Sequence, residues 1–565
     1  MKYLISFILL TNFLIAQNLD SLYNELLLLH PQKGKTTYST TTSNMPNVKC
    51  GFPLIANVRE HFNEFTSVQQ NRIKDILTRP SRQTSIVSPS GIFRIHYDTT
   101  GINSPNYFNG ITNTIKLSVD SLAIAFDSAY SYEVNYLGYS SPPSDEGAGG
   151  DDLFDIYISR LGYYGVTDWE SNSSNQNMSY IKVDNKMDFY TKGIYAARAT
   201  AAHEFHHAIQ VGNYSDHLDG NTYYFEITST SMEEFVCDDV NDYYGYLWGY
   251  FNNTYRRFTY FDGTAGGGGY DRAIWNIFLK EKFEQEENNP KKGFDLIKRS
   301  WELMRNNKHT AMEAISLALA EKGLSLKNIF AEFAQWSYFT GHRSKEGEYF
   351  SEASEYPLVR PLAKYKYQPP KKTYMMQSQP MSNNFLLFDL SSSGINDTLF
   401  NIITNCDVNN ADTFPYENID YEYSLLTNNE EGSSQIVDGY YSILKSDNKQ
   451  FLKESDIFNN EIVNGSTIIG EEIDFAYPQP FNYSKHNFLS FPTKLNEQGF
   501  AKLTIYSISM DLIYSNNLQI LNAERVIVQW DGKNNSGNNV SSGIYIYVTE
   551  SNGKIIKGKI AIINN

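Results

Sequence analysis

The chain has 565 residues, of which 41% are hydrophobic, so it is long enough for several packed domains rather than a single core. Its formal net charge is −17 and its basic residues are scattered, which argues against nucleic acid or an anionic membrane as a partner. Its three cysteines (Cys50, Cys237 and Cys406) allow at most one intramolecular pair and exclude a disulfide-dense scaffold.

An export signal is predicted at residues 1–16, where Lys2 precedes an apolar run that ends near Ala16. No later segment approaches eighteen consecutive apolar residues, so we expect an exported mature chain without a transmembrane segment. Residues 17–90 are mixed and polar, with helical spacing over 58–80. We expect them to form a pro-region or an N-terminal subdomain.

Residues 91–365 are predicted to form an α+β domain in which strands come first and helices follow. Alternating polar and apolar residues predict strands, and apolar residues three or four positions apart predict helices. The expected strands cover residues 91–99, 153–161 and 178–184, and the first expected helices cover 111–134, 195–212 and 224–240.

One expected helix contains the sequence AAHEFHHAIQ at positions 201–210, which includes the pattern His-Glu-x-x-His. Residues four positions apart lie on one face of a helix, so His203 and His207 could bind one zinc ion together. Glu204 is placed to take a proton from a zinc-bound water, whose pKa the metal lowers.

The alternative is a helix surface that carries solvated histidines. The flanking residues are apolar, however, and a buried motif of this kind would leave its imidazoles without partners unless a metal is bound. We therefore expect Zn²⁺ as the cofactor. His206 is the surplus histidine, and we expect it to flank the site or to face solvent.

A catalytic zinc ion needs a third protein ligand and an open position for water. Glu226 follows His207 after eighteen intervening residues and opens a second expected helix, so we predict that it is the third ligand. Glu233 lies two helical turns further on, on the same face, where it could bond to a ligand imidazole. Glu234 is rotated by about 100° from that face.

This spacing resembles that of the aminopeptidase-type gluzincins, a group of zincin metallopeptidases. The local sequence, HEFHHAIQ followed by FEITSTSMEE, is more similar to that of a group of bacterial secreted metalloproteases, which have HEFFHAIQ and then EGTATWMED. Short matches such as KCGFPL and GGDDLFDIYI extend the resemblance over roughly residues 45–360. Ile227 stands where that pattern has Gly and Ser231 where it has Trp, which alters the expected pocket shape.

The resemblance also suggests an oxyanion-stabilising tyrosine beyond the ligand glutamate. Tyr270, which follows four glycines, could take this role, and Tyr260 is a rival. With 42 tyrosines in the chain, packing or surface exposure is the competing interpretation.

Cys50 lies in the sequence VKCGFP, which resembles the propeptide thiol that caps zinc in matrix metalloproteases. The alternative, which we favour, is a disulfide to Cys237, since Cys237 is expected close to the helix face of Glu226. A free thiol is a third interpretation.

The stretch 145–155 is acidic and rich in glycine, and clustered carboxylates can bind Ca²⁺ in exported proteins. Its spacing matches no complete calcium loop, so a solvated turn is the favoured interpretation.

Paired prolines within 364–374 predict a linker, and helical spacing stops beyond it. Short alternating runs predict two β-sandwich modules, at 375–470 and 477–565. In the second, Trp530, Asp531 and Gly532 and the strands around them resemble the immunoglobulin-like C-terminal sorting domain of type IX secretion. That resemblance implies the type IX machinery as a partner and release or attachment at the cell surface, whereas the pattern alone also allows a binding module.

The sequence thus predicts a multidomain, secreted, zinc-dependent metallopeptidase that acts on protein or peptide substrates. The alternatives are a surface adhesin whose zincin domain is inactive and a zinc hydrolase of a non-peptide bond. The presence of Glu204, which an adhesin would not need, favours the enzyme.

Overall fold

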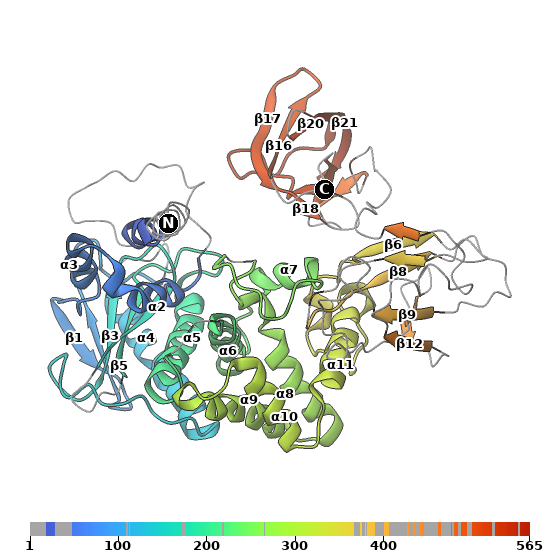
Figure 1. The fold of residues 1–565 in the computed structure, drawn as a ribbon. Helices are drawn as coiled ribbons and strands as arrows, with labels where there is room; N and C mark the ends of the chain where they lie inside the picture. The colour runs from blue at the N-terminus through green and yellow to red at the C-terminus, as the bar shows by residue number, and fades with distance from the viewer. Residues whose placement is uncertain are drawn as a thin grey trace, which may run out of the picture. The chain divides into compact units, whose positions relative to one another are not determined.

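The computed structural model forms two compact units, the first comprising Met1–Tyr250 and Thr259–Pro357 and the second Phe251–Phe258 and Leu358–Asn565 (Figure 1). The described residues are 19–28, 48–366 except 109–110, 112, 172–176, 217, 219 and 265, then 373–375, 379, 381–389, 401–405, 426–428, 434–436, 441–445, 462–464, 476, 479–483, 488–493, 500–522, 526–551 and 554–564. The predicted signal peptide, the third cysteine and the paired prolines of the expected linker lie outside them.

A five-stranded sheet, in the order β1-β2-β3-β5-β4, is the scaffold of the first unit. Its strands are β1 (Thr84–Val87), β2 (Phe93–Tyr97), β3 (Phe154–Ser159), β4 (Gly165–Ser171) and β5 (Asn177–Asp184). The three inner strands are parallel, whereas β1 and β4 are antiparallel edge strands. Strands β3 and β5 are buried along most of their length, as expected for the interior of a sheet with parallel pairing.

Two long helices cover one face of this sheet (Figure 1). They are α4 (Ile115–Tyr130) and α5 (Gly193–Asn213). Helix α4 packs on β2, α5 packs on β4 and β5, and the two helices also pack on each other, so they share that face. A π-helical segment, Ser131–Tyr136, follows α4 directly.

The remaining helices of the first unit build outward from α5. Helix α6 packs on α5, α8 packs on α6, and α9, α10 and α11 complete this half. Their bounds are α6 (Thr222–Val236), α7 (Tyr244–Asn252, whose last two residues belong to the second unit), α8 (Ile274–Glu287), α9 (Pro290–Met304), α10 (Ala311–Glu321) and α11 (Leu326–Tyr338). Helix α10 starts at a capping box formed by Thr310 and Glu313, which satisfies two backbone amides that a helix end leaves free.

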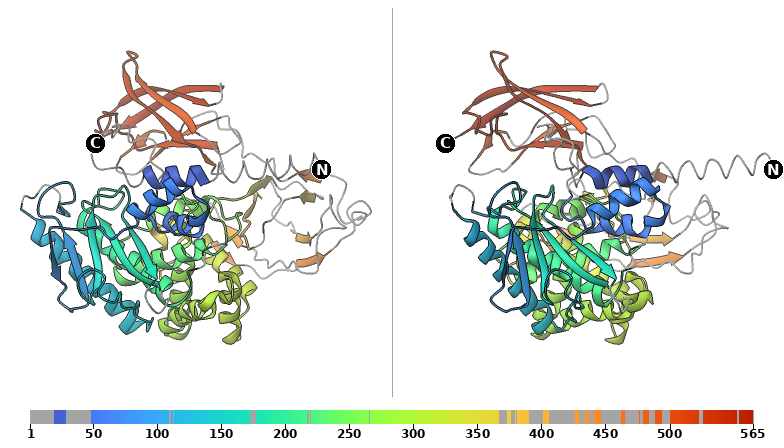
Figure 2. Two further views of the ribbon diagram at one scale, coloured as in Figure 1. Left: turned by 60° about the vertical axis from the view of Figure 1, so that its left-hand side comes forward. Right: turned by 90° about the vertical axis from the view of Figure 1, so that its left-hand side faces the viewer.

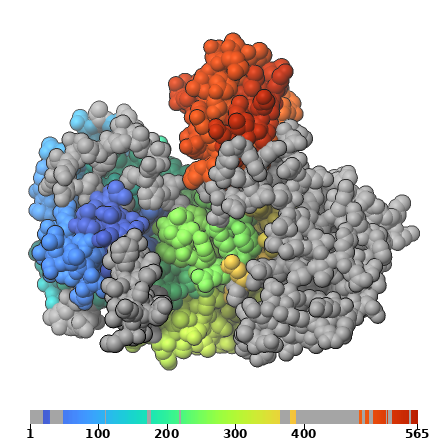
Figure 3. All heavy atoms as spheres, turned by 45° about the horizontal axis from the view of Figure 1, so that its top comes forward, coloured from blue at the N-terminus to red at the C-terminus, as the bar shows by residue number. Residues whose placement is uncertain are grey.

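The residues before the sheet also belong to the first unit. Helices α2 (Phe52–Glu60) and α3 (Ser67–Ile76) lie next to each other beside the sheet (Figure 2), and α2 packs on β4. These residues form part of the outer surface in Figure 3, where they are blue. The expected division at residue 90 falls between β1 and β2, which pair with each other.

The C-terminal residues of the second unit form two sheets around one apolar core. The larger sheet has the order β14-β21-β20-β16-β17 and the smaller one β15-β19-β18. The strands are β14 (Phe481–Asn482), β15 (Leu489–Pro492), β16 (Phe500–Ser507), β17 (Leu512–Gln519), β18 (Leu521–Asn522), β19 (Val526–Trp530), β20 (Gly543–Ser551) and β21 (Lys554–Ile563). Leu503 and Tyr547 of the larger sheet share the core with Phe491 and Trp530 of the smaller one.

The middle of the chain contributes short paired strands. They are β6 (Ala363–Lys366), β7 (Thr373–Met375), β8 (Leu386–Asp389), β9 (Asn401–Asn405), β10 (Leu426–Asn428), β11 (Ser434–Ile436), β12 (Tyr441–Lys445) and β13 (Ile462–Asn464). Pairs β6/β8, β9/β12 and β7/β13 are parallel, and β10/β11 is antiparallel. The chain is therefore a mixed α/β protein with several separate sheets.

None of the helices in the described part of the chain has the length and apolar character that crossing a bilayer requires.

Candidate metal centre

The two histidines of the sequence motif project from the buried middle of α5. The surrounding helix is rich in alanine, which favours the helical backbone and lets neighbouring elements approach closely. His203 is 2% exposed and His207 is fully buried. The side chains one turn apart face α6, as the helical period requires.

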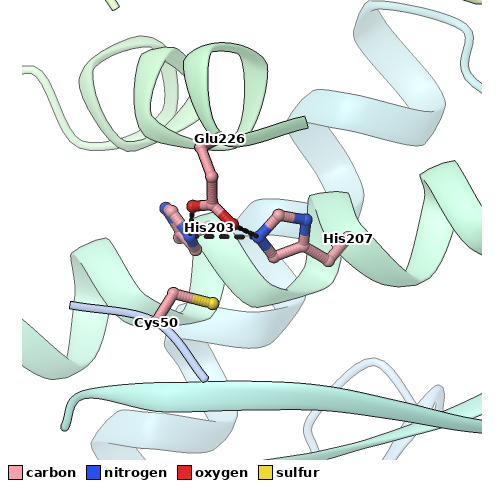
Figure 4. Close-up of side chains that lie close together, drawn as sticks. All are labelled: Cys50, His203, His207 and Glu226. Carbon is pink, nitrogen blue, oxygen red and sulfur yellow. Dashed lines mark hydrogen bonds and ion pairs between the residues drawn. The ribbon is translucent and has the colours of Figure 1, made fainter. Parts of the chain in front are cut away.

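Helix α6 supplies the carboxylate that faces them. Glu226 is fully buried in the first half of this helix, and its side chain points at the two imidazoles (Figure 4). Gly269, at φ +98°, lets the backbone approach closely here, because a Cβ at this position would lie 2.8 Å from the Cβ of Glu226.

Three side chains converge at distances that suit a zinc site. The two histidine Nε2 atoms are 3.2 Å apart, and the Glu226 oxygens lie 3.3 Å from His203 Nε2 and 3.4 Å from His207 Nε2. A tetrahedral ion with bonds of about 2.1 Å holds its ligand atoms roughly 3.4 Å apart. Neither Glu226 oxygen has a hydrogen-bond partner although both are buried. The residues present therefore fit a zinc ion, which would satisfy these orphaned oxygens.

The other ring nitrogens are held by neighbours, which aim the Nε2 atoms at one another. Glu233 Oε1 lies 2.7 Å from His203 Nδ1, and Gln210 Oε1 lies 2.8 Å from His207 Nδ1. The Ser229 hydroxyl is also 3.1 Å from His207 Nδ1. Such partners orient a ligand imidazole and fix its tautomer. The structure thus places Glu233 where the two-turn spacing predicted it.

The site's carboxylates and imidazoles shift one another's protonation. Burial opposes a charge on His203, but Glu226 and Glu233 outweigh it and raise its pKa to about 9. Burial also opposes the charge on Glu226, and here His207 and His203 prevail and lower its pKa. The cluster therefore favours positive charge at its centre, which a divalent cation also provides.

Glu204 lies beside the cluster with two defined partners. Thr167 donates its hydroxyl to Glu204 Oε2 at 2.8 Å, and the Cys50 thiol donates to Oε1 at 3.1 Å. Burial raises the pKa of Glu204, although His203 and His207 oppose that shift. A carboxylate with a raised pKa beside a metal position is suited to general acid–base catalysis.

Cys50 is a member of the same cluster. Its sulfur and the ligand atoms of His203, His207 and Glu226 all lie within 4.8 Å of one another, and the thiol points into the group (Figure 4). The favoured disulfide with Cys237 is wrong, because both cysteines are free and buried. Cys237 follows the end of α6, where its thiol interacts with Arg198 instead.

Lys49 is a residue of this region that the sequence analysis did not single out. It is buried and forms ion pairs with Glu233, at 2.7 Å, and with Asp242. Burial opposes its charge, yet the two carboxylates outweigh it and raise the pKa of Lys49. The lysine thus neutralises the carboxylate that orients His203.

Tyr270 reaches the edge of the site from the segment that follows the glycine run. It is 1% exposed, its ring centre is 6.2 Å from that of His203, and its hydroxyl accepts a hydrogen bond from the Cys50 backbone N–H at 3.4 Å. The rival Tyr260 donates its hydroxyl to Asp262 at 3.0 Å.

His206 does not face solvent. It is fully buried, and its Nδ1 lies 2.7 Å from Glu133 of the π-helical segment after α4. It therefore links α5 to that segment, outside the group of possible metal ligands.

The acidic loop at 145–155 pairs its carboxylates with arginines. Arg79 lies 2.8 Å from Asp145 and 2.5 Å from Asp155, and Arg94 pairs with Asp151. Within the described residues, these aspartates do not form a group of possible metal ligands.

No protein-family profile matches this chain, and no curated protein matches it. Among solved structures, it is similar to PorZ, described as an essential bacterial surface component of the type-IX secretion system of Porphyromonas gingivalis. The two are 16% identical, with a TM-score of 0.14, over 24% of this chain and 19% of that chain. The match thus spans about a fifth of that protein, and it is too weak to assign a fold or a role.

Proposed function

We propose that this protein is a secreted zinc-dependent metallopeptidase. The observation that carries the proposal is the convergence of His203, His207 and Glu226 at 3.2–3.4 Å, with both Glu226 oxygens buried and without a hydrogen bond. Leaving buried carboxylate oxygens without a hydrogen bond is costly, and a cation bound between Glu226 and the two imidazoles would remove that cost. Glu204 beside the cluster favours a catalytic rather than a purely structural site.

A zinc ion bound here would polarise the scissile carbonyl and make a water molecule acidic. Glu204 would take a proton from the attacking water and pass it to the leaving amine. Thr167 fixes the orientation of Glu204 through its 2.8 Å hydrogen bond. Glu233 and Gln210 hold the two imidazoles so that their Nε2 atoms keep facing the reaction centre.

Tyr270 would donate its hydroxyl to the oxyanion that develops on the peptide carbonyl. Its hydroxyl accepts a hydrogen bond from the Cys50 backbone N–H at 3.4 Å, so it faces a peptide backbone group beside the metal position. We propose a zincin-type fold for residues 91–365, because the edge strand β4 and the helix α5 frame the cluster.

The test measures hydrolysis of a proteome-derived peptide library together with zinc content. Because the Cys50 thiol contacts Glu204, the assay uses the full chain carrying Cys50→Ser. Adding Glu204→Gln should lower turnover by about 10²- to 10⁴-fold and leave about one zinc ion per chain. Glu234→Gln is the matched control, since Glu234 lies outside the cluster and should not affect turnover. Full activity of the Glu204→Gln chain would contradict the mechanism.

We further propose that residues 477–565 are an immunoglobulin-like sorting domain for type IX secretion, and that 375–470 is a second β-sandwich module. Support comes from the turn at Trp530, Asp531 and Gly532, where Trp530 donates its indole N–H to Lys533 at 2.7 Å and Tyr483 donates to Gly532 at 2.6 Å. Deleting 477–565 should trap the chain in the periplasm of a host with this machinery, and fusing it to a periplasmic reporter should carry the reporter outward. Surface arrival of the deleted chain would make the domain a binding module instead.

A further inference from the structure

We propose that residues 48–51, here called the covering segment, hold this metal centre in a latent state with the Cys50 sulfur as the fourth zinc ligand. The inference rests on the proposed function and specifies how that same site is regulated. It begins from the position of the thiol: the Cys50 sulfur lies within 4.8 Å of every ligand atom of His203, His207 and Glu226.

The fourth position is the one that catalysis needs. A catalytic zinc ion has three protein ligands and keeps the fourth position for water, whereas four protein ligands close the site. The Cys50 sulfur also lies 3.1 Å from Glu204 Oε1, where the attacking water would have to meet its base. One side chain thus occupies both the metal's free position and the contact to the general base.

The backbone of the covering segment blocks the adjacent sheet edge. Strand β4 is at the edge of the sheet, and its outer side pairs with the covering segment. Tyr164 donates its N–H to the Lys49 carbonyl at 3.1 Å, and the Gly51 N–H donates to the Gly165 carbonyl at 3.0 Å. An extended peptide can bind an enzyme by adding to such an edge. The covering segment therefore takes the backbone groups that a peptide substrate would use beside the metal.

Two neighbours of Cys50 fix the segment in place. Lys49 is buried between Glu233 and Asp242. Phe52 stacks on the His207 imidazole, with ring centres 4.0 Å apart and an angle of 10° between the planes. Both contacts involve residues that form or orient the metal site, so docking of the segment and closure of the site are coupled.

Opening would be a ligand exchange. The Cys50 thiol would give up its proton to solvent when it binds the metal; on opening, the thiolate would leave the metal position and regain a proton from solvent, and a water molecule would take its place. Residues 48–51 would separate from β4 in the same step, which frees the edge for a peptide. No redox change is needed, because Cys50 is a free thiol.

The test for ligation uses the full chain with Co²⁺ in place of zinc. The wild-type protein should show a thiolate-to-cobalt charge-transfer band that is absent from the Cys50→Ser chain. Cys237→Ser is the matched control, because Cys237 is also buried and free but lies outside the cluster, so its band should persist. Identical spectra for wild type and Cys50→Ser would overturn the assignment of Cys50 as a ligand.

The test for latency measures how tightly the zinc-loaded proteins bind a peptide hydroxamate. This ligand can bind only where the metal has an open position. Cys50→Ser should bind the hydroxamate about 10-fold or more tightly than wild type, as expected if the open form is about 10% or less of the wild-type population. Peptide hydrolysis should rise by a similar factor. Equal hydroxamate affinity in the two proteins would overturn latency. Hydroxamate binding without hydrolysis by any variant would instead overturn the peptidase proposal while latency stands.

Discussion

The facing helices α5 and α6 and the two C-terminal sheets bury side chains of opposite kinds. Between α5 and α6 lie His203, His207, Glu226 and Glu233, none more than 2% exposed. The C-terminal sheets instead bury aliphatic and aromatic groups such as Leu503 and Trp530. Apolar burial stabilises a fold without help, whereas buried charges are costly unless they are paired or bind an ion. The polar core therefore points to function and the apolar core to stability.

The largest expected effect is on zinc affinity, and it distinguishes the roles of two buried carboxylates of α6. Glu226→Gln should lose most of the zinc affinity, because it removes a ligand atom. Glu233→Gln should weaken zinc binding by only about 10- to 100-fold, because it removes the partner of a ligand imidazole. Competition with a chromophoric chelator gives both dissociation constants. A Glu233→Gln chain that loses zinc while Glu226→Gln holds it would mean that the ligand is misassigned.

A substitution in the apolar core should lower stability and leave zinc affinity unchanged. Leu503 is fully buried, so Leu503→Ala should destabilise the C-terminal sheets by about 2–5 kcal/mol. Hydrogen exchange of the β16 amides should report this loss, while zinc affinity stays at the wild-type value. A weakened zinc site in this variant would show that the two cores are coupled, contrary to the comparison.

A smaller effect, on the pH dependence of stability, concerns Glu234, a buried carboxylate outside the group of possible metal ligands. Burial, together with Glu352 and Asp238, raises the pKa of Glu234 from 4.5 to about 10. A raised folded-state pKa contributes stability that is complete below about pH 4.5 and is lost as pH rises towards about 10. The Glu234→Gln chain has no such titration. The free energy of unfolding of this variant, relative to that of wild type, should therefore increase steadily from about pH 4.5 to about pH 10.

Thermal unfolding of wild type and Glu234→Gln at about pH 5, 7 and 9 measures the dependence. The difference between their midpoints should be largest at the highest pH. A constant difference would show that Glu234 ionises normally in the folded chain.

The parts of the site that depend on one helix were predictable from the sequence. The four-residue period alone brings His203 and His207 to one face, and the two-turn spacing aligns Glu233 with Glu226. The structure brings all four side chains together. The expected helix at 195–212 corresponds to α5, and the strands at 153–161 and 178–184 correspond to β3 and β5.

The covering segment could not be predicted in this way. Cys50 and Lys49 meet residues more than 150 positions away, and local patterns carry no information about such pairings. Strand β4 was also missed, because its first five residues, 165–169, are all buried and its sequence shows no polar–apolar alternation. The expected disulfide failed for the same reason: proximity of Cys237 to the face of Glu226 does not determine where the segment around Cys50 runs.

X-ray absorption at the zinc K edge of the purified full chain tests the central claim most directly. A centre built from His203, His207, Glu226 and Cys50 predicts about one zinc ion with a single sulfur neighbour at about 2.3 Å and three nitrogen or oxygen neighbours at about 2.0–2.2 Å. A chain that binds no zinc, or zinc surrounded by six oxygen neighbours, would contradict it.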